Sequence, residues 1–209
     1  MYIMNQNQSI RLGILGSTRG TSLQPIIDAI ENKELNAEIR IIISNKPDAG
    51  ILEKAKQHNL NLKYIPTEYI DGKKKQREEY DNEVSIILQS FGVNLILMIG
   101  YMRIVSKSFT DTWKNKCLNV HPSLLPDFAK GMDIAVHNAV LKSGKKHTGC
   151  TVHMVTDEVD GGPIIHQEKC EVKDNDTPET LKERVQKLEG LSFILSIEKL
   201  RNNMFRMEI

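Results

Sequence analysis

The sequence has few of the residues that mark several classes of protein. Its 209 residues include three cysteines and one tryptophan, and aromatic residues make up 5% of the chain. The widely spaced cysteines contain no CxxC pair, which argues against a disulfide framework and against a zinc site. We expect Cys117, Cys150 and Cys170 to be buried free thiols in a reducing compartment. The densest apolar run, residues 95–99, is far too short to span a bilayer.

An excess of charge of either sign is also absent. The 28 lysines and arginines nearly balance 27 acidic residues, and the formal charge of +1 gives no indication of nucleic acid or a membrane surface as a partner. The one local run, Lys73–Lys75, is expected to be a solvated helix start. Residues 1–10 lack the apolar core of a signal peptide, so a cytoplasmic location is expected. A hydrophobic content of 40% over this length suits one sizeable core, and we expect a single domain over residues 1–209.

Three familiar motifs are missing. The glycines after the first apolar segment do not follow GxGxxG, so a dinucleotide is not indicated. No GxSxG sequence occurs, which argues against a serine nucleophile elbow. The acidic stretch 155–163 does not have the ligand spacing of an EF-hand, and we expect no metal.

Apolar segments alternate with helix-like segments in the first half of the chain. Strands are expected at residues 10–15, 38–44, 62–66 and 94–99, with helices beginning near Leu23, Ala49 and Lys74. Strands that are apolar on both faces predict a parallel sheet covered by helices. The second half predicts a short strand at 118–121, an antiparallel pair of strands at 148–155 and 163–172 appended to the parallel sheet, and a last helix that Thr177 caps. The predicted fold class is therefore α/β: a Rossmann-like, mostly parallel twisted sheet with antiparallel strands in its C-terminal half.

The loop after the first strand, Gly16–Ser22, is rich in glycine and hydroxyl groups. Glycines let a ligand approach the backbone closely, and the free N–H groups at a helix start favour an anion such as phosphate. Thr21 and Gln24 also fit a capping box, which needs no ligand. Both interpretations, a phosphate site and a plain capped turn, remain open at this level.

Asn119 and His121 lie two residues apart on an expected strand that ends at Pro122. Their side chains therefore face the same way at the carboxyl end of that strand. An amide can donate to a developing oxyanion and an imidazole can move a proton, so the pair suits acyl-type transfer. The alternative is a turn-capping asparagine and a histidine with a purely structural partner.

The turn-rich segment 157–162 ends in Asp160-Gly161-Gly162. An acid that faces a histidine raises the histidine's pKa and orients its ring, although an ordinary solvated loop would have the same composition. His153, on the preceding strand, fits a structural role as well as a functional one. His137 shows no partner pattern and is expected to be structural or exposed.

Taken together, three sequence blocks resemble the folate-dependent formyltransferases, and within them the branch that acts on glycinamide ribonucleotide in purine synthesis. The blocks are residues 119–126, 148–153 and 160–165; residues 77–81 and 100–106 match as well, and the resemblance extends from about Ile10 to Leu200. It implies a formyltransferase fold whose N-terminal half binds the nucleotide phosphate and whose C-terminal half binds folate. It also implies direct transfer of a formyl group from 10-formyltetrahydrofolate, the co-substrate, to the amine of glycinamide ribonucleotide. No metal is implied, and a monomer or a homodimer is expected.

The resemblance implies a role for each matching residue. The catalytic residues, which stabilise the oxyanion and move protons, would be Asn119, His121 and Asp160. The residues that hold the nucleotide substrate would be Gly20, Thr21, Ser22, Gln186 and Glu189. The folate site would be formed by Arg77, Met102, Arg103, Ile104, Val105, Asn119, Thr156, Asp157, Glu158, Val159 and Asp160.

Three departures from the family pattern carry expectations of their own. Thr21-Ser22 stands where the family commonly has Ser-Asn, which alters the phosphate contacts. Gly190 follows Glu189 where relatives often have histidine, so we expect a looser substrate end. The segment from Asp127 to Gly144 is a few residues longer than usual.

Three other functions are less favoured. Formyl-folate hydrolases tend to carry a second histidine where this chain has Pro122, and an extra amino-terminal domain. Methionyl-tRNA formylation would need a basic carboxyl-terminal extension. A non-catalytic nucleotide-binding sensor would keep the loop 16–22 but has no reason to combine it with Asn119, His121 and Asp160.

Overall fold

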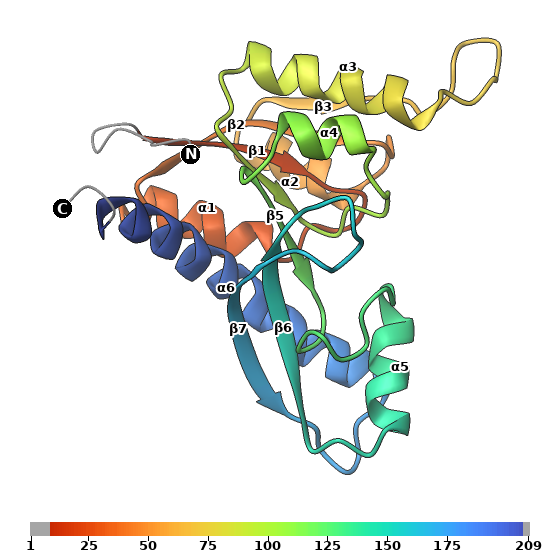
Figure 1. The fold of residues 1–209 in the computed structure, drawn as a ribbon, viewed down its shortest axis with the longest axis vertical. Helices are drawn as coiled ribbons and strands as arrows, with labels where there is room; N and C mark the ends of the chain where they lie inside the picture. Colours follow the sequence, from red (N-terminus) through yellow and green to blue (C-terminus); the bar gives the residue numbers. More distant parts are fainter. Residues whose placement is uncertain (1–8, 207–209) are drawn as a thin grey trace.

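Seven strands form one mixed sheet in the computed structural model, which describes residues 9–206 (Figure 1). In chain order the strands are β1 (Ile10–Leu15), β2 (Ala37–Ser44), β3 (Leu62–Tyr64), β4 (Leu95–Met98), β5 (Cys117–His121), β6 (His147–Met154) and β7 (Ile164–Glu171). Their order across the sheet is β3-β2-β1-β4-β5-β6-β7. The first five strands are parallel, whereas β6 and β7 run antiparallel to their neighbours. The predicted α/β class and the antiparallel C-terminal strands are confirmed.

Helices cover both faces of the sheet. They are α1 (Leu23–Glu31), α2 (Gly50–Gln57), α3 (Arg77–Ser90), α4 (Lys107–Thr112), α5 (Ile134–Lys142) and α6 (Pro178–Arg206). One apolar cluster joins α1, α2 and α6 to one face, and a second joins α3 and α4 to the other. Leu12 and Ile14 of β1 point into the first cluster and Leu15 into the second, as the alternation of a strand requires. Figure 1 shows α3 and α4 together on one side of the sheet and α1 with α6 on the other.

The predicted element boundaries hold to within about three residues, except that α6, predicted to end near Arg201, continues to Arg206; there are also two omissions and one misplaced feature. The short helices α4 and α5 were not expected. The lysine run at 73–75 is not a helix start, because α3 begins at Arg77. Instead, the N–H of Lys75 donates to the carbonyl of Thr67, and the backbones of Lys74 and Glu68 form an isolated antiparallel β-bridge. The lysines therefore belong to a hairpin before the helix.

The two predicted helix caps have different outcomes. At α6, the Thr180 N–H donates to the Thr177 hydroxyl at 3.3 Å, as expected. At α1, the expected capping box is not formed: Ser22 is the N-cap and its side chain makes no capping hydrogen bond. The Gln24 amide donates instead to Asp28, 2.8 Å away. The capping box of Thr21 and Gln24, which was the alternative that needs no ligand, is therefore wrong.

Cys117 and Cys150 are buried free thiols, as expected, whereas Cys170 is partly exposed. No helix within residues 9–206 is both long and apolar enough to cross a membrane. The expectation for residues 1–10, that they hold no signal core, falls mainly on residues outside the described range.

Candidate active site

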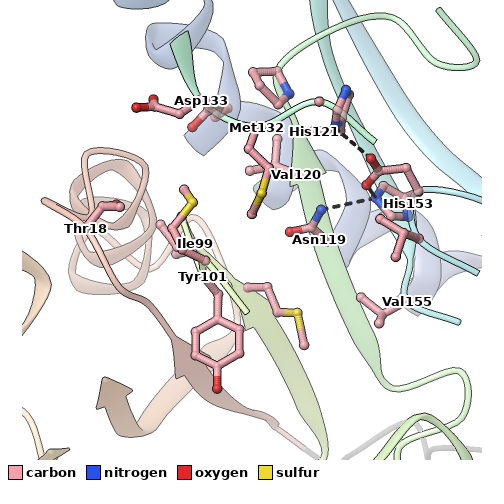
Figure 2. A pocket seen from close by; sticks show the side chains of 18 of the residues that line it. Thr18, Ile99, Tyr101, Asn119, Val120, His121, Met132, Asp133, His153 and Val155 are labelled. Atoms are coloured by element: carbon pink, nitrogen blue, oxygen red, sulfur yellow. Dashed lines mark hydrogen bonds and ion pairs between the residues drawn. The ribbon is translucent and has the colours of Figure 1, made fainter. Parts of the chain in front are cut away.

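A cavity of about 430 Å³ opens at the carboxyl ends of β1, β4 and β5 (Figure 2). The strand order reverses between β1 and β4, and open α/β sheets bind ligands in the crevice that forms at such a point. The loop after β1 supplies Thr21 and Ser22 to one side, and the loop after β4 supplies residues 99–105 to the other. The end of β5 forms the floor between them with residues 119–122.

Asn119, His121 and Asp160 meet in this cavity. The His121 Nδ1 atom lies 3.2 Å from the Asp160 Oδ2 atom, and both side chains are less than a tenth exposed. Figure 2 shows Asn119 and His121 projecting from the same strand. Asp160 reaches His121 from a separate segment, the loop between β6 and β7. Asn119 and His121 face the same side of β5, as predicted, and the loop that carries Asp160 lies on that side.

The loop between β6 and β7 can carry Asp160 to this position because of its backbone geometry. Asp160 itself has φ +56, a left-handed conformation that aspartate tolerates better than most residues. A Cβ atom on Gly162 would lie 1.9 Å from the Met154 carbonyl oxygen, so only glycine fits where the chain returns to the sheet. The backbone N–H of Lys130 then donates to Asp160 Oδ2 at 2.8 Å and fixes the carboxylate from the far side.

The hydrogen-bond partners of His121 favour a proton shared with Asp160. Its Nε2 atom lies 3.0 Å from the Phe128 carbonyl oxygen, so that nitrogen must donate. Its Nδ1 atom then faces the Asp160 carboxylate. In a neutral ring Nδ1 would carry a lone pair and could not donate to this acceptor, whereas a protonated Nδ1 can. Burial lowers the pKa of His121 below its usual value, although the charge of Asp160 opposes this. Asp160 thus acts on the pKa of His121 in the predicted direction, and burial, which the sequence did not reveal, acts more strongly in the opposite direction.

The pKa of Asp160 lies below its ordinary value. Burial alone would raise it, but the nearby His153 ring, the charge of His121 and the N–H of Lys130 together outweigh burial. The carboxylate form is consequently the stable one near neutral pH. The negative charge of this carboxylate stabilises the protonated form of His121.

His153 is the most important residue whose role the sequence left open. Its Nδ1 atom lies 2.9 Å from the Met154 carbonyl oxygen, so this nitrogen donates and Nε2 of the neutral ring accepts. The Asn119 amide nitrogen lies 3.2 Å from that Nε2 atom, and Asp160 Oδ1 lies 3.5 Å from it. One amide N–H of Asn119 is thereby engaged, and the second remains for a ligand. His153 thus orients the amide that Asn119 presents.

The expected nucleotide end of the cavity is formed by α1 and α6. Thr21, Ser22, Gln186 and Glu189 line it, whereas Gly20 does not. The Ser22 hydroxyl donates to the Glu189 carboxylate. Burial raises the pKa of Glu189 to about 7, and the hydroxyl of Ser22 opposes the shift. In the first turn of α1 the Leu23 N–H donates to the Gly20 carbonyl at 3.1 Å and Pro25 has no N–H, so an anion would depend mainly on the N–H groups of the loop before the helix.

The expectation of a looser substrate end at Gly190 is wrong. A Cβ atom at this position would lie 2.7 Å from Pro25 Cγ and 3.2 Å from the Ser22 carbonyl oxygen. The missing side chain lets α6 approach the start of α1 more closely than any other residue would allow. The tight contact lies next to the hydrogen bond between Ser22 and Glu189.

Most residues expected at the folate site line the opposite part of the cavity. They are Met102, Arg103, Ile104, Val105, Thr156, Asp157, Glu158, Val159 and Asp160. Arg77 is not among the lining residues; it is exposed, at the first position of α3. Its expected contact with folate stays a prediction.

Several residues that line the cavity were given no definite role there from the sequence. They are residues 130–133, His137, His153 and Lys182. His137 is 1% exposed, and its Nδ1 atom has no hydrogen-bond partner among residues 9–206. Burial, followed by the charge of Lys182, lowers its pKa to about 4. Within the described range, no group of three or more histidine, cysteine or acidic side chains could hold a metal ion.

Comparison with known proteins places this site in a family. The formyl transferase family model matches residues 10–197. The chain is therefore an enzyme of the formyltransferase family.

Two of the similar proteins are named as a formyltransferase or a transformylase, and a third is named for purine biosynthesis. The phosphoribosylglycinamide formyltransferase of Escherichia coli K12 is 34% identical over 93% of this chain and 88% of its own length. The glycinamide ribonucleotide transformylase 1 of Symbiobacterium toebii has a similar crystal structure, with a TM-score of 0.87 and 33% identity, covering 97% of this chain and 92% of that one. The trifunctional purine biosynthetic protein adenosine-3 of Gallus gallus is 42% identical over 92% of this chain, which spans only 18% of that longer protein.

Proposed function

We propose that this enzyme transfers a formyl group from 10-formyltetrahydrofolate to the amine of glycinamide ribonucleotide, a step of purine biosynthesis. The observation that carries the proposal is the convergence of Asn119, His121 and Asp160 in one cavity. That cavity also contains the loop that leads into α1, which suits a phosphate, and a separate wall that combines apolar side chains, such as Met102 and Ile104, with polar ones, which suits a flat heterocycle with a polar edge. Its relatives of similar length bear the corresponding name.

In the proposed reaction the neutral substrate amine attacks the formyl carbon. A carbon–nitrogen bond forms, and the carbonyl electron pair moves to the formyl oxygen. The bond to folate N10 then breaks, the carbonyl re-forms, and the proton lost by the amine is taken up at N10. No protein nucleophile is needed, which agrees with the absence of GxSxG from the sequence.

Asn119 and His121 have the chemistry to stabilise the negative oxygen. His153 occupies one N–H of the Asn119 amide, and the other is available to the oxyanion. Both ring N–H groups of a protonated His121 face other acceptors, the Phe128 carbonyl and the Asp160 carboxylate, so in this arrangement the ring would stabilise the growing negative charge through its own positive charge. Removal of an oxyanion donor such as the Asn119 amide typically costs about 2.7–4 kcal/mol of barrier.

The buried Glu189 suits the amine end of the nucleotide. Its carboxyl group titrates near neutral pH, where the substrate amine must lose a proton before it attacks. The anionic form of Glu189 would attract the arriving ammonium group. Its hydrogen bond with Ser22 links this end of the cavity to the loop expected to hold the phosphate.

The experiment that tests the function compares acceptors at a fixed concentration of 10-formyltetrahydrofolate. Release of tetrahydrofolate should be rapid with glycinamide ribonucleotide, slow with glycinamide, which lacks the phosphate, and absent with ribose 5-phosphate, which lacks the amine. Equal release without any acceptor would identify a hydrolase and overturn the proposal. Asn119→Ala should reduce the rate by about a hundred-fold or more if the amide stabilises the oxyanion.

A further inference from the structure

The cavity wall between β4 and α4 has no regular secondary structure of its own. Residues 102–105 line the cavity, but they belong to neither a strand nor a helix. A segment of this kind lacks ladder hydrogen bonds, so its conformation depends on contacts from elsewhere. One such contact comes from the loop after β1, where the Ser17 hydroxyl accepts the Met102 N–H at 3.0 Å, and two further contacts come from α3.

The first contact from α3 is a buried carboxylate. Asp81 of α3 is 1% exposed, and its Oδ2 atom accepts the backbone N–H of Ser106 at 2.5 Å. Ser106 is also the N-cap of α4, where its hydroxyl accepts the Phe109 N–H at 3.3 Å. Asp81 therefore fixes the point at which the wall ends and α4 begins. Neither Asp81 nor the adjacent Tyr80 lines the cavity itself.

The second contact is an aromatic ring. The guanidinium carbon of Arg103 lies 4.2 Å from the centre of the Tyr80 ring. Tyr80 is fully buried, and its hydroxyl donates to the Ile65 carbonyl at 3.3 Å, so the ring is a fixed platform. The Arg103 Nε atom is buried without a hydrogen-bond partner among the described residues. A cation with an unpaired buried N–H needs nearby negative charge, and the charge of Asp81 acts on Arg103.

We propose that Asp81 is a positioning residue for the folate side of the reaction: with Tyr80 it clamps the wall 102–106 so that the backbone of this wall can meet the polar edge of a flat heteroaromatic ligand. The proposal rests on the proposed function, because it takes the heterocycle to be the folate pteridine. Backbone N–H and C=O groups recognise a heterocycle only when they are held in place before it binds. Asp81 does this from behind the wall and touches no substrate.

The test measures folate binding separately from turnover. Asp81→Asn keeps the shape and an acceptor for the Ser106 N–H but removes the charge, and Asp81→Ala removes both. The matched control is Asp111→Asn, which removes an exposed carboxylate of α4 that pairs with Lys107 at 3.0 Å. Binding of a non-reactive 10-formyltetrahydrofolate analogue is measured by calorimetry, and KM for glycinamide ribonucleotide is measured in parallel. Thermal unfolding of each variant shows that it is folded.

Asp81→Asn should weaken binding of the analogue by about ten-fold, the difference between a charged and a neutral hydrogen bond, and Asp81→Ala should weaken it further. KM for glycinamide ribonucleotide should stay within about two-fold of wild type, and Asp111→Asn should change neither quantity. Unchanged binding of the analogue by folded Asp81→Asn and Asp81→Ala would overturn the proposal, as would equal weakening of both substrates. If the wild-type protein binds the analogue but transfers no formyl group, the proposed function fails while the role of Asp81 is still decided by the binding data.

Discussion

Gly190→Ala is expected to destabilise the enzyme, although the same change stabilises most helices. Gly190 lies inside α6, and alanine gains about 1 kcal/mol over glycine at an open helix interior. Here the new Cβ atom would lie 2.7 Å and 2.8 Å from two ring atoms of Pro25. A proline ring cannot rotate away, so α6 and α1 must separate. Overpacking of this kind costs about 1–3 kcal/mol, and the net result is a loss of up to about 2 kcal/mol.

The assay is urea unfolding at pH 7, together with KM for glycinamide ribonucleotide. KM should rise, because the contact adjoins the hydrogen bond between Ser22 and Glu189. Leu191→Ala is the control, since Leu191 is the next residue of α6 and is 48% exposed. Pro25→Gly should recover part of the loss when combined with Gly190→Ala. A stabilised Gly190→Ala variant with unchanged KM would refute the close-contact argument.

Three further predictions concern the histidines. Asp160→Asn should slow transfer and shift the alkaline limit of kcat/KM to lower pH, because the charge of Asp160 raises the pKa of His121; an unshifted pH–rate profile would contradict this. His153→Phe should lower kcat about ten-fold with little change in either KM, since Asn119 loses the partner that orients its amide. His137 is held neutral with a pKa of about 4, so the unfolded chain takes up a proton that the native chain does not as pH falls below about 6.5. Stability should therefore fall by up to about 3 kcal/mol between pH 6.5 and 4, and His137→Gln should reduce that loss in urea titrations at several pH values.

Local patterns in the sequence were enough to predict the sheet. The β-branched runs of β1 and β2 are apolar on both faces, which only a sheet covered on two sides accommodates. The short helix α4 was missed because its six residues are mostly polar and it depends on Ser106, which Asp81 holds from a distant helix. α5 was missed because it lies in the segment 127–144, where no sequence pattern fixed the boundaries.

The shared face of Asn119 and His121 on β5 was predictable for a similar reason. Two residues two apart on one strand share a face whatever the rest of the chain does. The part played by His153 was not predictable, because its contacts with Asn119 and Asp160 depend on the antiparallel register of β5 with β6 and on the return of the loop at Gly162. The net pKa of His121 was missed for the same kind of reason: burial is a property of the assembled cavity.

The coupling between His121 and Asp160 is the central claim, and a double-mutant cycle tests it most directly. The measurement is kcat/KM for glycinamide ribonucleotide at saturating 10-formyltetrahydrofolate, for wild type, His121→Ala, Asp160→Asn and the double variant. Because the carboxylate is taken to act only through the imidazole 3.2 Å away, the double variant should be little slower than His121→Ala alone. Losses that add fully in the double variant would contradict the account and would assign Asp160 a role independent of His121.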